Sequence, residues 1–152
     1  MTAIQCFERI RADGKIIDES MKAADMFALG FPEKIVEIKW RNYDDEVSLQ
    51  FPYGVLAAVV AGRNFLAINE SDAQGQRSLW VLNSDGTRRL QVSDVQEIGA
   101  QAEAVSYRWF EGARNNAPNA FGVVFERLSD KSMFQVDIDA EGGNAIAIYP
   151  MR

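Results

Sequence analysis

Apolar and polar residues alternate along much of this chain, a pattern typical of half-buried β-strands. Between residues 34 and 41, one face of the predicted strand is mostly apolar and the other is mostly charged. Similar segments recur about every 10 residues and are separated by turn residues. The pattern predicts a mainly β protein: an antiparallel meander, a sandwich or a partly open barrel, with an α+β fold as the alternative.

Three short turn sequences place hairpins between the predicted strands. Ser84-Asp85-Gly86 lies between two apolar segments and gives the clearest signal, because glycine adopts a positive φ without a steric penalty. Asp13-Gly14 and Glu141-Gly142-Gly143 have the same character. The stretch Gly112–Asn119 combines three asparagines with one glycine and one proline, so we expect a loop there.

Helix is expected in only a few places. Ser20 can cap a short helix that runs to Leu29, with Gly30 and Pro32 ending it. Val55–Ala61 is apolar throughout and fits either a buried helix or a central strand, and its valines favour the strand. Ser93–Gln96 resembles a capping box, which predicts one helical turn.

No change in composition divides the chain, so residues 1–152 are expected to form a single domain. Within it, the stretches 55–98 and 105–152 have similar apolar patterns when one is shifted by 56 positions onto the other. Few identities accompany this shift. We interpret the two stretches as similar β-units rather than as a proven repeat.

The absence of certain residue types limits the chemistry. The chain has no histidine and one cysteine, which excludes Ser-His-Asp and Cys-His catalysis and any zinc site built on several cysteines. Known nucleotide-binding and hydrolase motifs are also missing. We therefore predict a protein that is not an enzyme, with no catalytic residues, no metal and no organic cofactor. Cys6 lies on an apolar strand, and we expect it to be buried and inert.

The formal charge of −6 limits the kinds of molecule that the protein is expected to bind. An acidic surface repels nucleic acids and anionic membranes and attracts basic proteins. No apolar run has the roughly 18 residues of a membrane span, and the N-terminus lacks the pattern of a signal peptide. With the single cysteine, this favours the cytoplasm as the location.

Two groups of residues are candidates for binding a partner. The first is an acidic turn, and the second places aromatic residues beside a carboxylate; together they comprise Asp44, Asp45, Glu46, Trp109, Phe110 and Glu111. Solvated acidic turns and core aromatics are the simpler explanations, and a carboxylate pair for catalysis is a third. Trp109 and Phe110 are adjacent on one strand and point to opposite faces, so they are alternative anchors.

A further acidic run, Asp137–Gly142, begins like a calcium-binding loop. The pattern requires glutamate at its twelfth position, and Ile148 stands there instead. We therefore predict a strand that carries its acidic residues on the solvent face and then enters a turn.

Small, acidic, motif-free β-rich proteins are often dedicated protein binders, and bacterial immunity proteins, which neutralise basic toxins such as nucleases, are of this kind. By this analogy the leading hypothesis is an immunity-type or inhibitor-type protein that binds a basic partner. The alternative is a β-barrel that holds a small molecule in an apolar interior.

Overall fold

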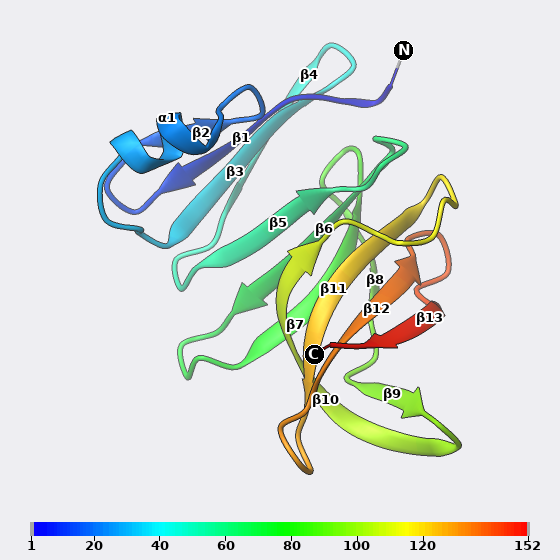
Figure 1. The fold of residues 1–152 in the computed structure, drawn as a ribbon. Helices are drawn as coiled ribbons and strands as arrows, with labels where there is room; N and C mark the ends of the chain where they lie inside the picture. The colour runs from blue at the N-terminus through cyan, green and yellow to red at the C-terminus, as the bar shows by residue number, and fades with distance from the viewer. Residues whose placement is uncertain (1, 152) are drawn as a thin grey trace.

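The computed structural model describes residues 2–151 and consists almost entirely of antiparallel strands (Figure 1). The N-terminal part holds β1 (Ile4–Arg11), β2 (Ile16–Asp18), α1 (Ala23–Ala28), β3 (Ile35–Asn42) and β4 (Asp45–Gln50). The central part holds β5 (Val55–Val59), β6 (Phe65–Ser71), β7 (Arg77–Asn83), β8 (Arg88–Gln91) and β9 (Val95–Ile98). The last part holds β10 (Gln101–Glu111), β11 (Ala120–Arg127), β12 (Met133–Asp139) and β13 (Ala145–Pro150). The mainly β fold with one short helix is confirmed.

The strands form three sheets. The N-terminal sheet has the order β2-β1-β3-β4, the middle sheet β5-β6-β7-β8 and the C-terminal sheet β13-β12-β11-β10-β9. Most neighbours in each sheet are joined by short turns, as in a meander, and Figure 1 shows the middle sheet between the other two. The exception is β3, which pairs with β1 across the segment that contains β2 and α1.

Two hydrophobic cores hold the layers together. One core lies between the N-terminal and middle sheets, where Ile38 and Trp40 meet Leu66 and Ile68. The other lies between the middle and C-terminal sheets and includes Val81, Val123 and Phe125, among others. Along β6 and β7, successive residues enter opposite cores, so both faces of the middle sheet are dry.

This double burial explains why the central strands look apolar throughout rather than alternating. Val55–Ala61, ambiguous in the sequence, forms β5 over Val55–Val59, which confirms the expected strand. The turn at Gly86 is also confirmed: Asp85 Oδ1 accepts hydrogen bonds from the backbone N–H and hydroxyl of Thr87, 2.9 and 2.6 Å away.

Two local expectations were wrong in detail. The helix begins at Ala23 with Lys22 at its N-cap, because the Ser20 hydroxyl donates instead to Asp18 Oδ1 at 2.6 Å and closes an earlier turn. Ser93–Gln96 forms no helical turn; Val95 begins strand β9, which pairs with the start of β10. Ser93 Oγ accepts from the backbone of Val95, so its side chain serves a turn rather than a helix.

α1, the helix found within residues 2–151, has six residues, far fewer than a membrane crossing requires.

Candidate partner-binding surfaces

The acidic turn predicted from the sequence is the tip of the β3–β4 hairpin. Asn42 pairs with Asp45, which leaves Tyr43 and Asp44 as a two-residue turn, and Tyr43 has a φ of 56°. Asp44, Asp45 and Glu46 are all exposed, and none of them belongs to an ion pair within the described chain. Their negative charges are therefore free to act on a partner.

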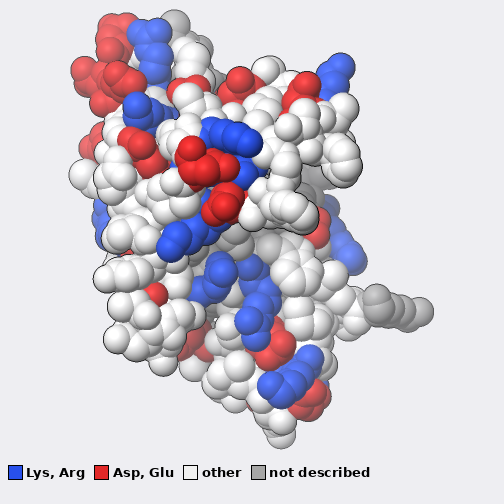
Figure 2. All heavy atoms as spheres, turned by 90° about the vertical axis from the view of Figure 1, so that its left-hand side faces the viewer, with Lys and Arg blue, Asp and Glu red and all other residues white. Residues whose placement is uncertain are grey.

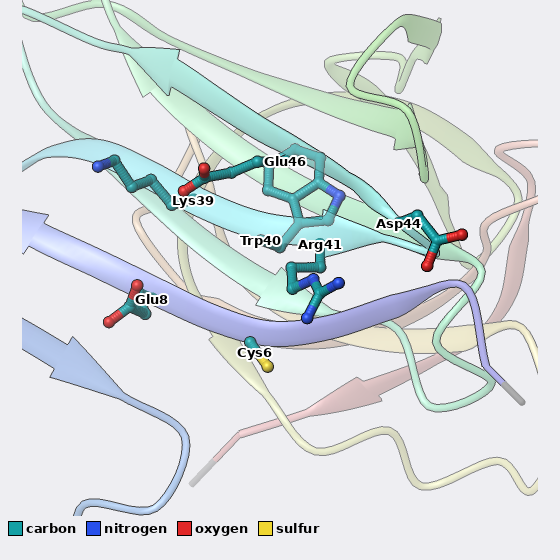
Figure 3. Close-up of a pocket in the computed structure, with 7 residues that line it drawn as sticks. All are labelled: Cys6, Glu8, Lys39, Trp40, Arg41, Asp44 and Glu46. Carbon is teal, nitrogen blue, oxygen red and sulfur yellow. The ribbon is translucent and has the colours of Figure 1, made fainter.

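A shallow hollow of about 390 Å³ lies beside this turn (Figure 3). Its lining combines three carboxylates and two cations with a cysteine and a tryptophan: Cys6, Glu8, Lys39, Trp40, Arg41, Asp44 and Glu46. Asp44 and Glu46 are thus brought to one hollow, whereas Asp45 lies outside its lining. The mixture of signs suits polar contacts with a protein surface rather than the capture of one ion.

The thiol of Cys6 is exposed, contrary to the expected burial. β1 contains an irregularity between Gln5 and Glu8, and Cys6 there adopts a φ of 55°. Such a β-bulge adds a residue to the strand and breaks the alternation of faces, so the sequence pattern misplaced this side chain.

The second candidate group lies at the end of β10. Trp109 is 42% exposed, and its indole N–H donates to Glu111 Oε1 at 2.9 Å. Phe110 turns inward, packs against the core and meets Phe121 edge-on with ring centroids 6.2 Å apart. Of the two alternative anchors, the structure exposes Trp109 and uses Phe110 for packing.

The two groups face different hollows. Glu111 lines a hollow of about 400 Å³, together with Ala58 and Val59 of β5 and residues of the loop between β10 and β11. Neither Asp44 nor Glu46 lines it. The acidic turn belongs to the N-terminal sheet and Trp109 to the C-terminal sheet, so they are separate candidates and not one patch.

The loop after Glu111 is held by a buried carboxylate that the sequence interpretation placed on the solvent face. Asp137 is 0% exposed, and its Oδ2 accepts the backbone N–H groups of Arg114 and Asn115 at 2.8 and 2.7 Å. Gln135 Nε2 donates to the Gly112 carbonyl at 2.9 Å and to Asp137 Oδ1 at 3.2 Å. These bonds stabilise a defined loop shape, because a buried carboxylate needs its hydrogen bonds.

A sequence signal for this clamp exists. Gln135 and Asp137 are two residues apart on β12 and therefore share one face, opposite the face of Val136 and Ile138. An asparagine-rich loop needs partners for its backbone N–H groups, and such a polar pair can supply them. The sequence does not show that the two meet, because they are more than 20 residues apart.

Three groups with shifted pKa values lie in turns or in the core. The pKa of Asp18 is lowered mainly by the hydrogen bond from the Ser20 hydroxyl, and that of Asp85 by the bond from Thr87. Burial raises the pKa of Tyr107 to about 12. Within residues 2–151, no three side chains of the metal-binding types gather in one place. The pKa shifts of Asp18, Asp85 and Tyr107 therefore have structural explanations.

Comparison with known proteins gives one informative match. No family model and no curated protein matches the chain. Among solved structures, a chain in the "Structure of Tne2 in complex with Tni2" superposes with a TM-score of 0.91 and is 39% identical. The match covers 98% of this chain and 99% of that one. With such identity over the full length of both chains, this protein belongs to the same family as the matching component of the Tne2–Tni2 complex.

Proposed function

We propose that this protein is a non-enzymatic inhibitor of the immunity type, which binds and neutralises a basic protein toxin in the cytoplasm. The observation that carries the proposal is the family relationship: a relative with the same fold along its whole length was solved in a complex of two proteins.

The charge of the chain supports a basic partner. A net charge of −6 steers a basic protein toward the surface and raises the rate of encounter. Figure 2 shows that the face over the N-terminal sheet carries both signs interspersed, without a continuous acidic field. The acidic turn at Asp44–Glu46 is therefore the local element we assign to steering, and Trp109 with Glu111 the element we assign to holding the partner.

A small-molecule barrel finds less support. The spaces between the three sheets are filled by core side chains such as Trp40 and Phe125, which are 1% and 0% exposed. A ligand-binding barrel would instead leave an apolar interior space of several hundred Å³.

The proposal is tested by measuring binding to the counterpart, from the same cell, of the other protein in the Tne2–Tni2 complex. We expect a one-to-one complex whose association rate falls steeply as salt rises, because screening shortens the range of the field to about 8 Å at physiological ionic strength. Asp45→Lys should slow association about 3-fold to 10-fold and leave dissociation almost unchanged. Stopped-flow fluorescence at several salt concentrations measures both rates.

The control is Glu97→Lys, which makes the same change of charge on β9, an exposed position at the opposite end of the molecule from the acidic turn (Figure 1). A general effect of net charge would slow association equally in both variants. Equal association rates for the two variants would contradict a role of the acidic turn in steering the partner. The absence of any complex would refute the proposed function.

A further inference from the structure

The middle sheet ends at β5, and the outer edge of this strand has no partner strand. Two hydrogen bonds show which residues of this strand are bonded to β6: one runs from Val60 N–H to the Phe65 carbonyl, and the other from Ser71 N–H to the Gly54 carbonyl. In an antiparallel pair, every second residue directs its N–H and C=O away from the neighbouring strand. Ala57 and Val59 therefore present their backbone donors and acceptors to the free edge.

Hollows lie on both sides of this edge. On the side of the N-terminal sheet, Ala57 and Val59 line a hollow of about 370 Å³ with Phe7, Arg9 and Ile17, among others. On the side of the C-terminal sheet, Ala58 and Val59 line the hollow of about 400 Å³ that includes Glu111 and the β10–β11 loop. The edge is thus recessed between two overhanging layers, with space above and below it.

β5 also lacks the charges, prolines and bulges by which many proteins protect a free edge. Its sequence, Val-Leu-Ala-Ala-Val, contains no charge and no proline, and its pairing with β6 has no bulge. The alanines leave room where a neighbouring strand would lie, about 4.8 Å away. An unprotected edge of this kind is suited to pairing with another extended chain.

We propose that β5 receives an extended segment of the partner protein as an added, antiparallel or parallel, fifth strand of the middle sheet. The inference rests on the proposed function and names the surface through which that partner is held. Backbone hydrogen bonds to Ala57 and Val59 supply affinity, and side chains of the segment alternate into the two hollows and supply specificity.

The recess decides between a foreign segment and a second copy of this chain. Pairing of two β5 edges requires both to approach within about 4.8 Å. Each β5 lies between its own overhanging sheets, so the layers of two copies would collide before the strands meet. A single extended segment has no such layers and enters the recess.

The hollow toward the N-terminal sheet indicates which side chain fits there. Arg63 is already paired with Glu19, with an N–O distance of 2.7 Å. Arg9 lines the same hollow, and its guanidinium makes no hydrogen bond or ion pair with other residues of the range 2–151. Asp18, which accepts hydrogen bonds from Ser20, lines this hollow as well and would repel a further carboxylate. The partner's segment should therefore place a neutral side chain with an acceptor oxygen, an amide or a hydroxyl, opposite Arg9.

Amide hydrogen exchange, followed residue by residue by NMR with the same counterpart protein as probe, tests the added strand directly. In the free protein, the Ala57 and Val59 amides should exchange rapidly, whereas Ala58, which is bonded to β6, exchanges slowly. In the complex, exchange at Ala57 and Val59 should slow at least 10-fold. Unchanged exchange at both amides in a fully formed complex would overturn the proposal.

Ala57→Pro gives an independent test. Proline removes the outward N–H and fills the edge but interrupts no bond to β6, so the fold should persist. We expect the dissociation constant for the counterpart protein to rise at least 10-fold. The matched control is Ser48→Pro on the free edge of β4, where the N–H also points outward, and it should bind like the wild type.

The possible outcomes separate the two proposals. If the wild-type protein forms no complex, the proposed function fails and the added strand fails with it. If the wild type binds and Ala57→Pro, folded by circular dichroism, binds equally well, only the added strand is wrong. If Ala57→Pro unfolds, the exchange experiment decides alone. Protection of Ala57 that grows with the concentration of this protein by itself would indicate pairing of two copies and would also overturn the inference.

Discussion

The two edges of the middle sheet are treated in opposite ways. β8 carries Arg88 and Arg89, has a register shift opposite Val81 and Leu82, and is covered by the β12–β13 turn. β5 is uncharged and regular and faces open hollows. Charge, irregularity and cover are the means by which β-proteins prevent edge pairing. Their concentration on β8 leaves β5 as the less protected edge of the middle sheet, which supports the proposed pairing there.

Among the features that distinguish the two edges, the β12–β13 turn that covers β8 should contribute most to the free energy of unfolding. Gly143 has a φ of 76°, and a Cβ there would lie 2.8 Å from Leu90 Cδ1. Gly143→Ala should therefore lower the free energy of unfolding by about 2–4 kcal/mol, from backbone strain and overpacking together. Urea unfolding measures the loss.

Gly75→Ala is the control for Gly143→Ala. Gly75 has a similar φ of 79°, but nothing lies within 4 Å of its added Cβ. It should lose only the backbone contribution, about 1–2 kcal/mol. If the two variants lose equal stability, the packing of the turn on Leu90 contributes nothing.

The chain that leaves β8 is anchored by Tyr107, whose hydroxyl donates to the Ser93 carbonyl and accepts from Gln96 Nε2 at 2.7 Å. Tyr107→Phe removes the hydrogen bonds to the Ser93 carbonyl and from Gln96 Nε2. It should lower the free energy of unfolding by about 1–3 kcal/mol.

The same residue predicts a pH dependence. Because burial raises the pKa of Tyr107 to about 12 from 10.0, its stabilising effect is complete below pH 10 and is lost as the pH rises toward 12. Tyr107→Phe should therefore be less sensitive to pH over this interval than the wild type. Urea titrations at pH 9 to 12 test this, and an unchanged alkaline loss in the variant would assign that loss to other groups.

The smallest effect is expected at the charged residues of β8. Arg88 Nη1 lies 2.6 Å from Glu70 Oε1, and its guanidinium lies 4.5 Å from the centre of the Trp80 ring. Because Arg88 is partly exposed, Arg88→Ala should reduce the free energy of unfolding by only about 0.5–1 kcal/mol. The ion-pair share of this loss should shrink in high salt, whereas a loss independent of salt would assign the whole effect to the ring contact.

Local features of this fold could be predicted from the sequence. The Asp85-Gly86 turn depends on neighbouring residues alone, and the β-branched valines of Val55–Val59 favoured a strand over a helix. Ser93 failed as a helix cap because Val95–Ile98 pairs with the start of β10 in a hairpin, and this strand pairing outweighs the capping pattern. Cys6 was misplaced because a bulge leaves no clear pattern in one sequence.

The candidate surfaces also divide into features that are local in the sequence and features that depend on contacts between distant segments. Alternation on β10 showed that Trp109 and Phe110 face opposite ways. An irregularity between Tyr107 and Trp109 breaks the alternation, so that Phe110 rather than Trp109 joins Tyr107 in the core. The clamp at Asp137 and the recess at β5 require knowledge of which distant segments meet. The exposed acidic turn between β3 and β4 was predicted, since charge and turn residues are local properties, and its role in binding stays a prediction.

The double burial of the middle sheet has a consequence for synthesis on the ribosome. The chain emerges from its N-terminus, so the N-terminal sheet and then β5–β8 leave the exit tunnel first. Until β10–β12 follow, one face of the middle sheet, including Val81 and Leu79, has nothing to cover it. A nascent chain that stalls before β10 therefore displays an apolar surface, and we expect chaperones to bind it at that stage.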